Sequence, residues 1–191
     1  MSNHIDFYFD IISPYAYIAH KKILKHKNIV FNYKPIYLGG LHKLAGIDSP
    51  AFNKYKLKNN INDCNLVSEK NNIEFKWNSK FPINSLYLMR GYLVLDEETK
   101  KKYFEKCFNA YWKDDCDISD DQIVNNILEN CKIDQNLFFM NIKDEKIKEE
   151  LKKLTKLAFD KNVFGAPTFI VNKKIFWGQD RLDYALDEYF S

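Results

Sequence analysis

The first residue suited to chemistry is Ser13, which precedes Pro14 and follows the alternating apolar run of residues 5–11. Serine is a preferred helix N-cap because its hydroxyl accepts an otherwise unpaired amide hydrogen bond, and proline suits the next position because its missing N–H costs nothing there. The pattern therefore predicts a hydroxyl at the carboxyl end of a strand and at the positive end of a helix. Open α/β sheets bind ligands at such places, and anions are favoured there. A purely structural cap is the alternative role for Ser13.

The elements around Ser13 are predicted to form a strand–helix–strand unit. Residues 5–11 alternate apolar and polar side chains, as a pleated strand does. A helix is expected from Ser13 to about Lys27, followed by a second strand at residues 29–38. The apolar face of this helix would consist of Ala16, Ile18, Ala19, Ile23 and Leu24. Its solvated face would consist of His20, Lys21, Lys22, Lys25 and His26. Such a unit implies parallel strands with a right-handed crossover.

The middle of the chain, residues 41–162, is predicted to be helical almost throughout. Gly39 and Gly40 are expected to break the preceding pattern, and residues 41–65 to form loops and short helices. Further helices are expected at residues 83–95, 97–113, 120–130 and 134–141, and from residue 144 onward. The first of these is apolar on most faces and should be buried, with Asn84 or Ser85 as its cap. Ser119 begins a predicted capping box.

Strand patterns return after Asn162. Residues 168–171 and 175–177 are separated by a hairpin-type connection, and Asp180 can cap a last helix. That helix is expected to bury Leu182, Ala185, Leu186 and Tyr189. The fold class is therefore α/β: a βαβ unit, a long all-helical insertion and a ββα unit, which is the plan of the thioredoxin fold. We predict a thioredoxin-like domain formed by residues 1–40 and 163–191, with an inserted helical domain at residues 41–162.

The composition is that of a globular chain and argues against several classes of function. The 191 residues are 46% hydrophobic and 16% aromatic, which supports a packed core. The 29 basic and 26 acidic residues give a net charge of +3, too balanced to indicate nucleic-acid binding. No apolar stretch approaches the roughly 18 residues of a membrane span and no signal peptide is recognised, so we expect a cytoplasmic protein without a membrane partner. The four cysteines and four histidines lack metal-ligand spacing, and no metal is expected.

Two landmarks of the thioredoxin fold are present. In that fold the reactive group lies at the N-terminus of the first helix, where this chain has Ser13-Pro14-Tyr15-Ala16 in place of Cys-x-x-Cys. The second landmark is a proline that opens the third strand, supplied by Pro167. Such a proline is usually cis, which leaves the backbone of Ala166 free to pair with an extended thiol peptide. An ordinary proline at a strand start is the alternative.

Three motifs together resemble those of the 2-hydroxychromene-2-carboxylate isomerases, close relatives of the kappa-class glutathione transferases in the DsbA-like thioredoxin-fold group. They are Phe-Tyr-Phe-Asp-x-x-Ser-Pro-Tyr at residues 7–15, Phe-Gly-Ala-Pro-Thr-Phe at residues 164–169 and Trp-Gly-Gln-Asp-Arg-Leu at residues 177–182. Phe-Pro-x-Asn-Ser at residues 81–85 extends the resemblance into the insertion. The resemblance implies a homodimeric, glutathione-dependent enzyme that acts on a small electrophilic or aromatic acid.

The resemblance also implies a glutathione site. Ser13 would donate a hydrogen bond to the glutathione thiolate, so that the sulfur and not the serine would be the nucleophile. Ala166 would pair its backbone with the cysteinyl unit, and Asp180 would take the γ-glutamyl ammonium. The full set implied is Ser13, Ala166, Pro167, Trp177, Gly178, Gln179 and Asp180. A plain N-cap is the alternative for Asp180, and a core aromatic for Trp177.

The second substrate would lie against the helical insertion. The residues that fall near the isomerases' polar and basic substrate positions are Asn84, Lys43, Asn53 and Lys54. Asn84 matches best, and a solvated surface position is the alternative for the two lysines. Arg181 is expected either to clamp a carboxylate or to pair with Asp10.

Three functions remain open on these grounds. The first is cis–trans isomerisation through reversible addition of the glutathione thiolate to a conjugated double bond. The second, at the same Ser13 site, is kappa-type conjugation of glutathione or peroxide reduction. The third is a non-catalytic thiol-binding module. A dithiol oxidoreductase is disfavoured because Ser13 and Ala16 replace both cysteines of the redox motif.

Overall fold

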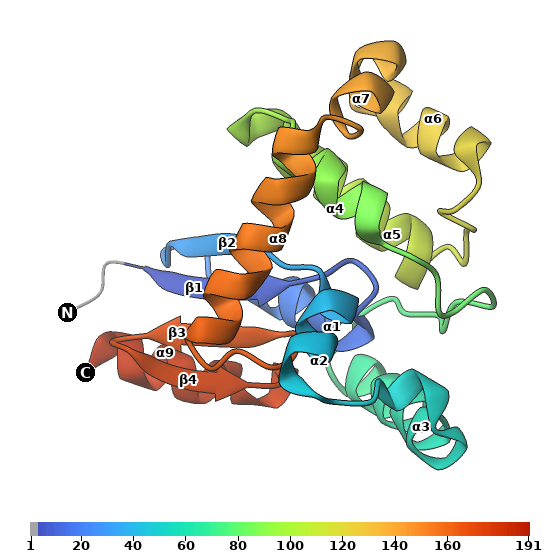
Figure 1. Ribbon diagram of the computed structural model, residues 1–191. Coiled ribbons are helices and arrows are strands. Elements are labelled where there is room, and N and C mark those ends of the chain that lie inside the picture. Colours follow the sequence, from blue (N-terminus) through green and yellow to red (C-terminus); the bar gives the residue numbers. More distant parts are fainter. Residues whose placement is uncertain (1–3) are drawn as a thin grey trace.

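A mixed four-stranded sheet lies at the centre of the molecule (Figure 1). The structure, a computed structural model, describes residues 4–191, so the first three residues of the predicted 1–40 segment lie outside the described part. The strands are β1 (Ile5–Phe9), β2 (Phe31–Pro35), β3 (Thr168–Val171) and β4 (Lys174–Trp177), in the order β2-β1-β3-β4. β1 and β2 are parallel, with Ile5 opposite Phe31, and β3 is antiparallel to both β1 and β4. The predicted βαβ and ββα units are therefore confirmed.

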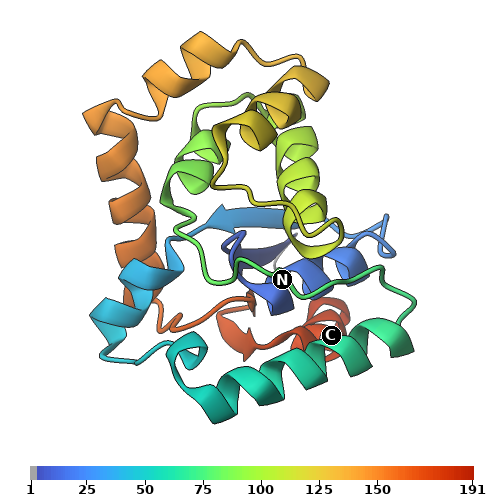
Figure 2. The ribbon, with the colours of Figure 1, turned by 90° about the vertical axis from the view of Figure 1, so that its right-hand side faces the viewer.

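The alternation in β1 sends its side chains to two different cores. Phe7 and Phe9 face a large core shared with helices α1 (Pro14–Ile23), α5 (Glu97–Trp112) and α9 (Leu182–Phe190). Tyr8 faces a smaller core shared with α2 (Leu38–Ala45) and α8 (Glu145–Asp160). The sheet is thus covered on both faces (Figures 1 and 2). Phe7 stacks on Phe169 of β3 with ring centroids 5.5 Å apart, which fixes the register of the central strands.

The helix after Ser13 forms as predicted at its start and differs on its solvated side. Ser13 is the N-cap, its Oγ accepts a hydrogen bond from the Ala16 N–H over 3.1 Å, and Pro14 occupies the first turn. The predicted solvated position of His20 is wrong, because the ring is buried against α5. Its two nitrogens lie against Tyr33 and Glu105, and these partners replace the lost water.

Gly39 and Gly40 do not break the structure, contrary to prediction, because both lie inside α2. A Cβ built on Gly40 would lie 2.9 Å from Cδ1 of Tyr37, so the absent side chain lets the Tyr37 ring pack against the helix backbone. The predicted boundary between residues 40 and 41 therefore falls within a helix. Asp10 accepts a hydrogen bond from the Leu38 N–H over 2.8 Å and so pairs the first amide of α2.

The segment at residues 41–65, expected to form loops and short helices, contains the end of α2 but also the start of a long helix. After the short 3-10 turn η1 (Pro50–Phe52) it forms the start of α3 (Lys54–Lys70), a 17-residue helix. Asn53 caps α3 by accepting hydrogen bonds from the amides of Tyr55 and Lys56. Only Cys64 and Ser68 of this helix are buried, so its composition carries little amphipathic signal. Figure 2 shows α3 crossing the lower edge of the molecule.

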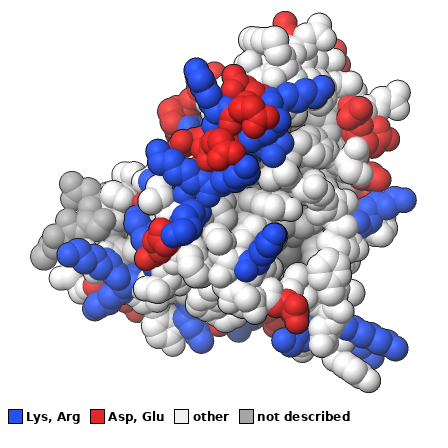
Figure 3. Space-filling view, viewed as in Figure 1, with Lys and Arg blue, Asp and Glu red and all other residues white. Residues whose placement is uncertain are grey.

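The remaining helices follow the predicted order with changed ends. They are α4 (Leu86–Leu93), α5, α6 (Asp121–Asn130), α7 (Gln135–Asn141) and α8. α4 is shorter than the predicted 83–95 helix, and Asp120 rather than Ser119 caps α6 through the Gln122 N–H. On the face of α8 toward solvent, basic and acidic side chains lie side by side, with Lys148 close to Glu145 (Figure 3). None of the helices in residues 4–191 combines the length and the apolar character that crossing a bilayer requires.

The C-terminal segment packs a last helix against β3 and β4. The 3-10 turn η2 (Gln179–Arg181) follows β4 and leads into α9, which buries Leu182, Ala185 and Leu186, while Tyr189 is half-buried. Asp180 does not cap α9, contrary to prediction, because it lies inside η2 and pairs with Arg181 at 3.1 Å. Arg181 is exposed, so the suggested ion pair with the buried Asp10 is wrong.

Candidate active site

Ser13 lies at the junction of α1 and the turn that precedes β3. Its hydroxyl donates a hydrogen bond to the Ala166 carbonyl over 2.9 Å and accepts one from the Ala16 amide. The side chain is 3% exposed. The two groups expected to receive a thiol therefore bind each other in this structure.

Asp10 is buried beneath Ser13 and organises the turn around it. The Asp10 carbonyl accepts the Ser13 N–H over 3.0 Å, and its carboxylate accepts the amides of Ile12 and Leu38 and the hydroxyl of Ser85. Burial raises the pKa of Asp10 to about 6, and these hydrogen bonds oppose the shift. One carboxylate thus ties the strand end to α2 and to the start of α4.

The turn before β3 has the expected geometry. The peptide bond between Ala166 and Pro167 is cis, and the Pro167 carbonyl accepts the Gly178 N–H over 3.0 Å. Trp177 pairs with Thr168 across β3 and β4 but is 53% exposed, so it is not a core aromatic. Its indole covers Gly165, where a built Cβ would lie 2.6 Å from Nε1. Trp177 and Phe164, with ring centroids 4.8 Å apart, form an aromatic wall beside Ala166.

The loop from Gly178 to Arg181 adds charged and amide groups to this corner. Gln179 is buried, and its Oε1 accepts a hydrogen bond from Lys22 Nζ over 2.5 Å. Burial lowers the pKa of Lys22, and the nearby carboxylates of Asp183 and Asp180 oppose this. Lys22 was predicted to be solvated, and its lysine-rich surroundings in the sequence gave no signal of a contact 157 residues away.

This part of the structure carries charges of both signs. Asp180 and Asp183 are its anions, while Lys22 and Arg181 are its cations. Gly178 has φ +112°, and a Cβ built there would lie 2.5 Å from Asp180 Oδ1, so glycine allows this carboxylate to fold back over the loop. Hydrogen bonds join Ser13 to Ala166 and Pro167 to Gly178, whereas Gln179 contacts Lys22, nine residues along α1 from Ser13. That these residues form one site stays a prediction.

The four predicted substrate residues lie on the surface of the insertion. Asn84 is exposed, and its side-chain oxygen accepts the Leu86 N–H over 3.0 Å in a turn at the start of α4. The next residue, Ser85, is buried and contacts Asp10. Asn53 and Lys54 lie together at the start of α3. Lys43 is exposed on α2. Asn84 is thus joined to the Ser13 region through Ser85, whereas the others are placed only on the neighbouring helices.

One of the four cysteines, Cys64 on α3, contacts Tyr15, two residues after Ser13. All four are free thiols, with Cys64, Cys107 and Cys131 buried and Cys116 half-buried. Burial raises the pKa of Cys107 and Cys64, which keeps both as unreactive thiols. Within residues 4–191, no group of three or more His, Cys, Asp or Glu side chains could hold a metal ion.

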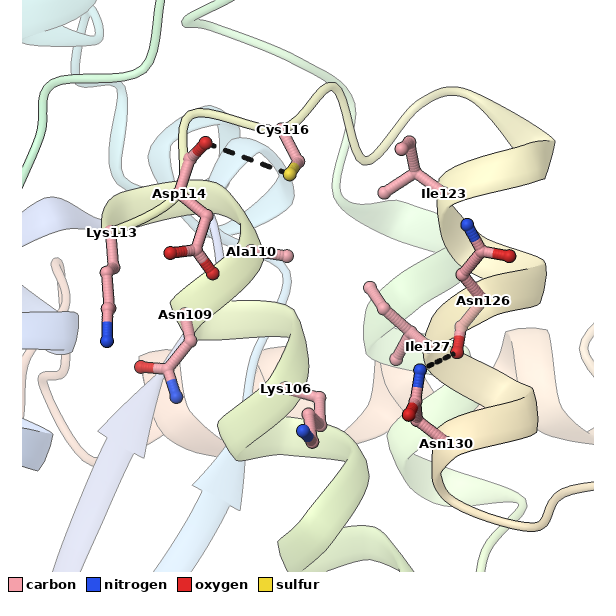
Figure 4. Close-up of a pocket in the computed structure, with 10 residues that line it drawn as sticks. All are labelled: Lys106, Asn109, Ala110, Lys113, Asp114, Cys116, Ile123, Asn126, Ile127 and Asn130. Atoms are coloured by element: carbon pink, nitrogen blue, oxygen red, sulfur yellow. Dashed lines mark hydrogen bonds between the residues drawn. The ribbon is translucent and has the colours of Figure 1, made fainter.

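A cavity of about 380 Å³ lies between α5 and α6 (Figure 4). Its lining includes Asn109, Asn126 and Asn130 and none of the predicted site residues. Asn109 Nδ2 donates to Glu105 Oε1 over 3.1 Å, so this wall of the cavity is also tied to the partner of His20. The cavity is therefore separate from the Ser13 site.

Comparison with known proteins finds relatives that match nearly the whole chain. The 2-hydroxychromene-2-carboxylate isomerase of Sphingobium xenophagum is 26% identical over 189 residues, covering 96% of each chain. Glutathione S-transferase kappa 1 of Caenorhabditis elegans is 27% identical over 203 residues, covering 96% of this chain and 89% of the relative. A solved 2-hydroxychromene-2-carboxylate isomerase structure superposes with a TM-score of 0.85 at 23% identity, over 96% of this chain and 92% of that chain.

These relatives are enzymes, and the superposition confirms the predicted fold with its helical insertion. The resemblance to the isomerase and kappa transferase group, drawn from three motifs, is also confirmed. The match to the DsbA-like thioredoxin domain extends over residues 4–190, nearly the whole chain. The protein therefore belongs to the DsbA-like thioredoxin domain family.

Proposed function

We propose that this chain is a glutathione-dependent isomerase of the 2-hydroxychromene-2-carboxylate isomerase type. The observation that carries the proposal is the Ser13 hydroxyl, held at the N-terminus of α1 against the carbonyl that precedes Pro167. Bound glutathione would supply a thiolate for reversible addition to the conjugated double bond of an aromatic acid. The chain itself would bind, orient and stabilise that thiolate.

Ser13 is suited to stabilise a sulfur anion. Lowering a thiol pKa by about two units requires roughly 2.7 kcal/mol. A hydrogen bond to a charged acceptor supplies about 1.5–3 kcal/mol, and the end of α1 roughly 0.3–1 kcal/mol more. Exchanging the neutral hydrogen bond to Ala166 for one to a thiolate is favourable for the same reason, since a neutral bond contributes only about 1 kcal/mol.

The proposal is tested by following the conversion of 2-hydroxychromene-2-carboxylate with and without glutathione. We expect turnover that requires glutathione without consuming it, and a loss of about 10- to 150-fold in kcat/KM for Ser13→Ala, the kinetic equivalent of the lost charged hydrogen bond. Ser49→Ala is the matched control, because Ser49 also caps a turn before a proline. No turnover, turnover without glutathione, or an active Ser13→Ala variant would refute the proposal.

A second candidate is kappa-type glutathione transfer, favoured by the likeness to the Caenorhabditis elegans enzyme. Titration of free thiols during the reaction separates the two, since conjugation consumes one thiol per product and isomerisation consumes none. Binding of glutathione without turnover on a panel of enones, halogenated aromatics and peroxides would instead support a thiol-binding module.

A further inference from the structure

A cavity of about 930 Å³ lies at the end of α1 remote from Ser13. It is bounded by residues at the C-terminal end of α1, by β2 and by the N-terminal half of α5, which crosses above them in Figure 2. The α1 residues that line it begin at His20, about 10 Å along the helix from Ser13, so the cavity lies toward the other end of α1. None of the predicted site residues lines it.

Apolar side chains, four of them Phe or Tyr, make up about half of the lining of this cavity. They come from three separate parts of the chain and include Ile23, Ile29, Phe31, Tyr92 and Phe104. The volume lies within the range of roughly 300–1,000 Å³ found for small-molecule sites, which are mostly apolar with a few placed polar groups. Walls of this kind suit a planar apolar body.

Polar groups of the lining include Tyr33, His20 and Glu105, together with Asn32 and His26. The Tyr33 hydroxyl lies 2.8 Å from His20 Nδ1, and His20 Nε2 contacts the Glu105 carboxylate. A carboxylate only accepts, so Nε2 carries the imidazole proton and Nδ1 of the neutral ring accepts the Tyr33 proton. The Tyr33 oxygen then keeps its lone pairs for a donor from the cavity.

The charges of this network support that assignment. Burial raises the pKa of Glu105, but hydrogen bonds from His20 and Lys21 outweigh it and hold the value at about 2. Burial lowers the pKa of His20, and Glu105 opposes this shift. At neutral pH the network therefore contains an ionised Glu105 and a neutral His20.

The rim of the cavity is cationic. Lys100 is paired with Glu97, and Lys102 with Glu98 at 2.8 Å. Lys27 and Lys101 are exposed on the same rim and form no ion pair with any residue in the described range 4–191. Two unneutralised ammonium groups above an apolar cavity favour an anionic ligand.

We infer that this cavity binds a small aromatic carboxylate that carries a hydroxyl group. The ring packs against the apolar walls, the hydroxyl donates to the Tyr33 oxygen, and the carboxylate is held by Lys27 and Lys101. This is a second ligand site, independent of the function proposed for Ser13.

The inference is tested by calorimetric titration of the full chain with 3-hydroxybenzoate, with chemical shifts of backbone amides to locate the ligand. We expect saturable binding that shifts amides of residues 23–33 and 97–105. The neutral 3-hydroxybenzamide should bind at least about fivefold more weakly, and the Lys27→Gln/Lys101→Gln double variant should weaken 3-hydroxybenzoate by about fivefold. Tyr33→Phe should reduce the preference for 3-hydroxybenzoate over benzoate by about threefold or more.

A control variant and the map of amide shifts decide where the ligand binds. Lys58→Gln removes an exposed lysine of α3 and should leave the affinity unchanged. Absence of saturable binding overturns the inference, and so do shifts confined to the Ser13 region. Equal affinity in the double lysine variant and in the wild-type chain overturns the assignment of the rim. The wild-type shift map keeps the test decisive if Tyr33→Phe does not fold.

Discussion

Asp10 gives the stability of this protein an unusual dependence on pH. A carboxyl group with a pKa near 6 in the folded state and 3.8 in the unfolded chain binds its proton more tightly when folded. Protonation of Asp10 therefore stabilises the fold. The contribution is fully present below the unfolded pKa and is lost as pH rises through about 6.

The size of the effect follows from the same shift. A difference of about two pKa units corresponds to about 3 kcal/mol between the two limits, and Asp10 is fully buried, so solvent does not reduce it. Between about pH 7 and about pH 4.5 the expected gain is about 2 kcal/mol. Asp10→Asn removes this gain. The variant has a cost of its own, because an amide places N–H groups against the donors of Ile12 and Leu38, but that cost does not change with pH.

The assay is urea unfolding followed by tryptophan fluorescence at both pH values, for wild type and Asp10→Asn. The free-energy difference between the two proteins should be larger by about 2 kcal/mol at the lower pH. Asp187→Asn, which removes an exposed carboxylate of α9, should show no such change in its difference from wild type. A pH-independent difference between wild type and Asp10→Asn would refute the reasoning.

Two further substitutions test the packing of the core and the proposed glutathione site. Gly91→Ala should cost about 1–3 kcal/mol in urea unfolding, because the new Cβ would lie 2.4 Å from Cζ of Phe138 in a packed core, and an unchanged midpoint would contradict that packing. Lys22→Met should raise the KM for glutathione by about threefold to tenfold through the lost hydrogen bond to Gln179, whereas Lys25→Met, nearby on the same helix end, should not. Equal KM values in the two lysine variants would exclude a role for the Lys22 contact.

Much of the fold could be predicted from local patterns. Alternation identified β1, the Ser13–Pro14 pair marked the start of α1, and the order of elements indicated the thioredoxin plan with its insertion. Local signals failed where a residue's role depends on a distant partner. His20 is buried against Glu105, 85 residues away, and Lys22 contacts Gln179, 157 residues away.

The sequence by itself therefore determines the strands, the helix starts and the candidate site residues. It does so through strand alternation, helix caps and the motifs around Ser13, Pro167 and Trp177. Only the tertiary structure decides their charge and availability. Burial raises the pKa of Asp10. Packing brings the Ser13 hydroxyl against the Ala166 carbonyl, and it places His20 in a buried polar network instead of on the solvated surface. The physical reason is that desolvation and long-range hydrogen bonds depend on neighbours brought together by packing, and a local pattern contains no record of them.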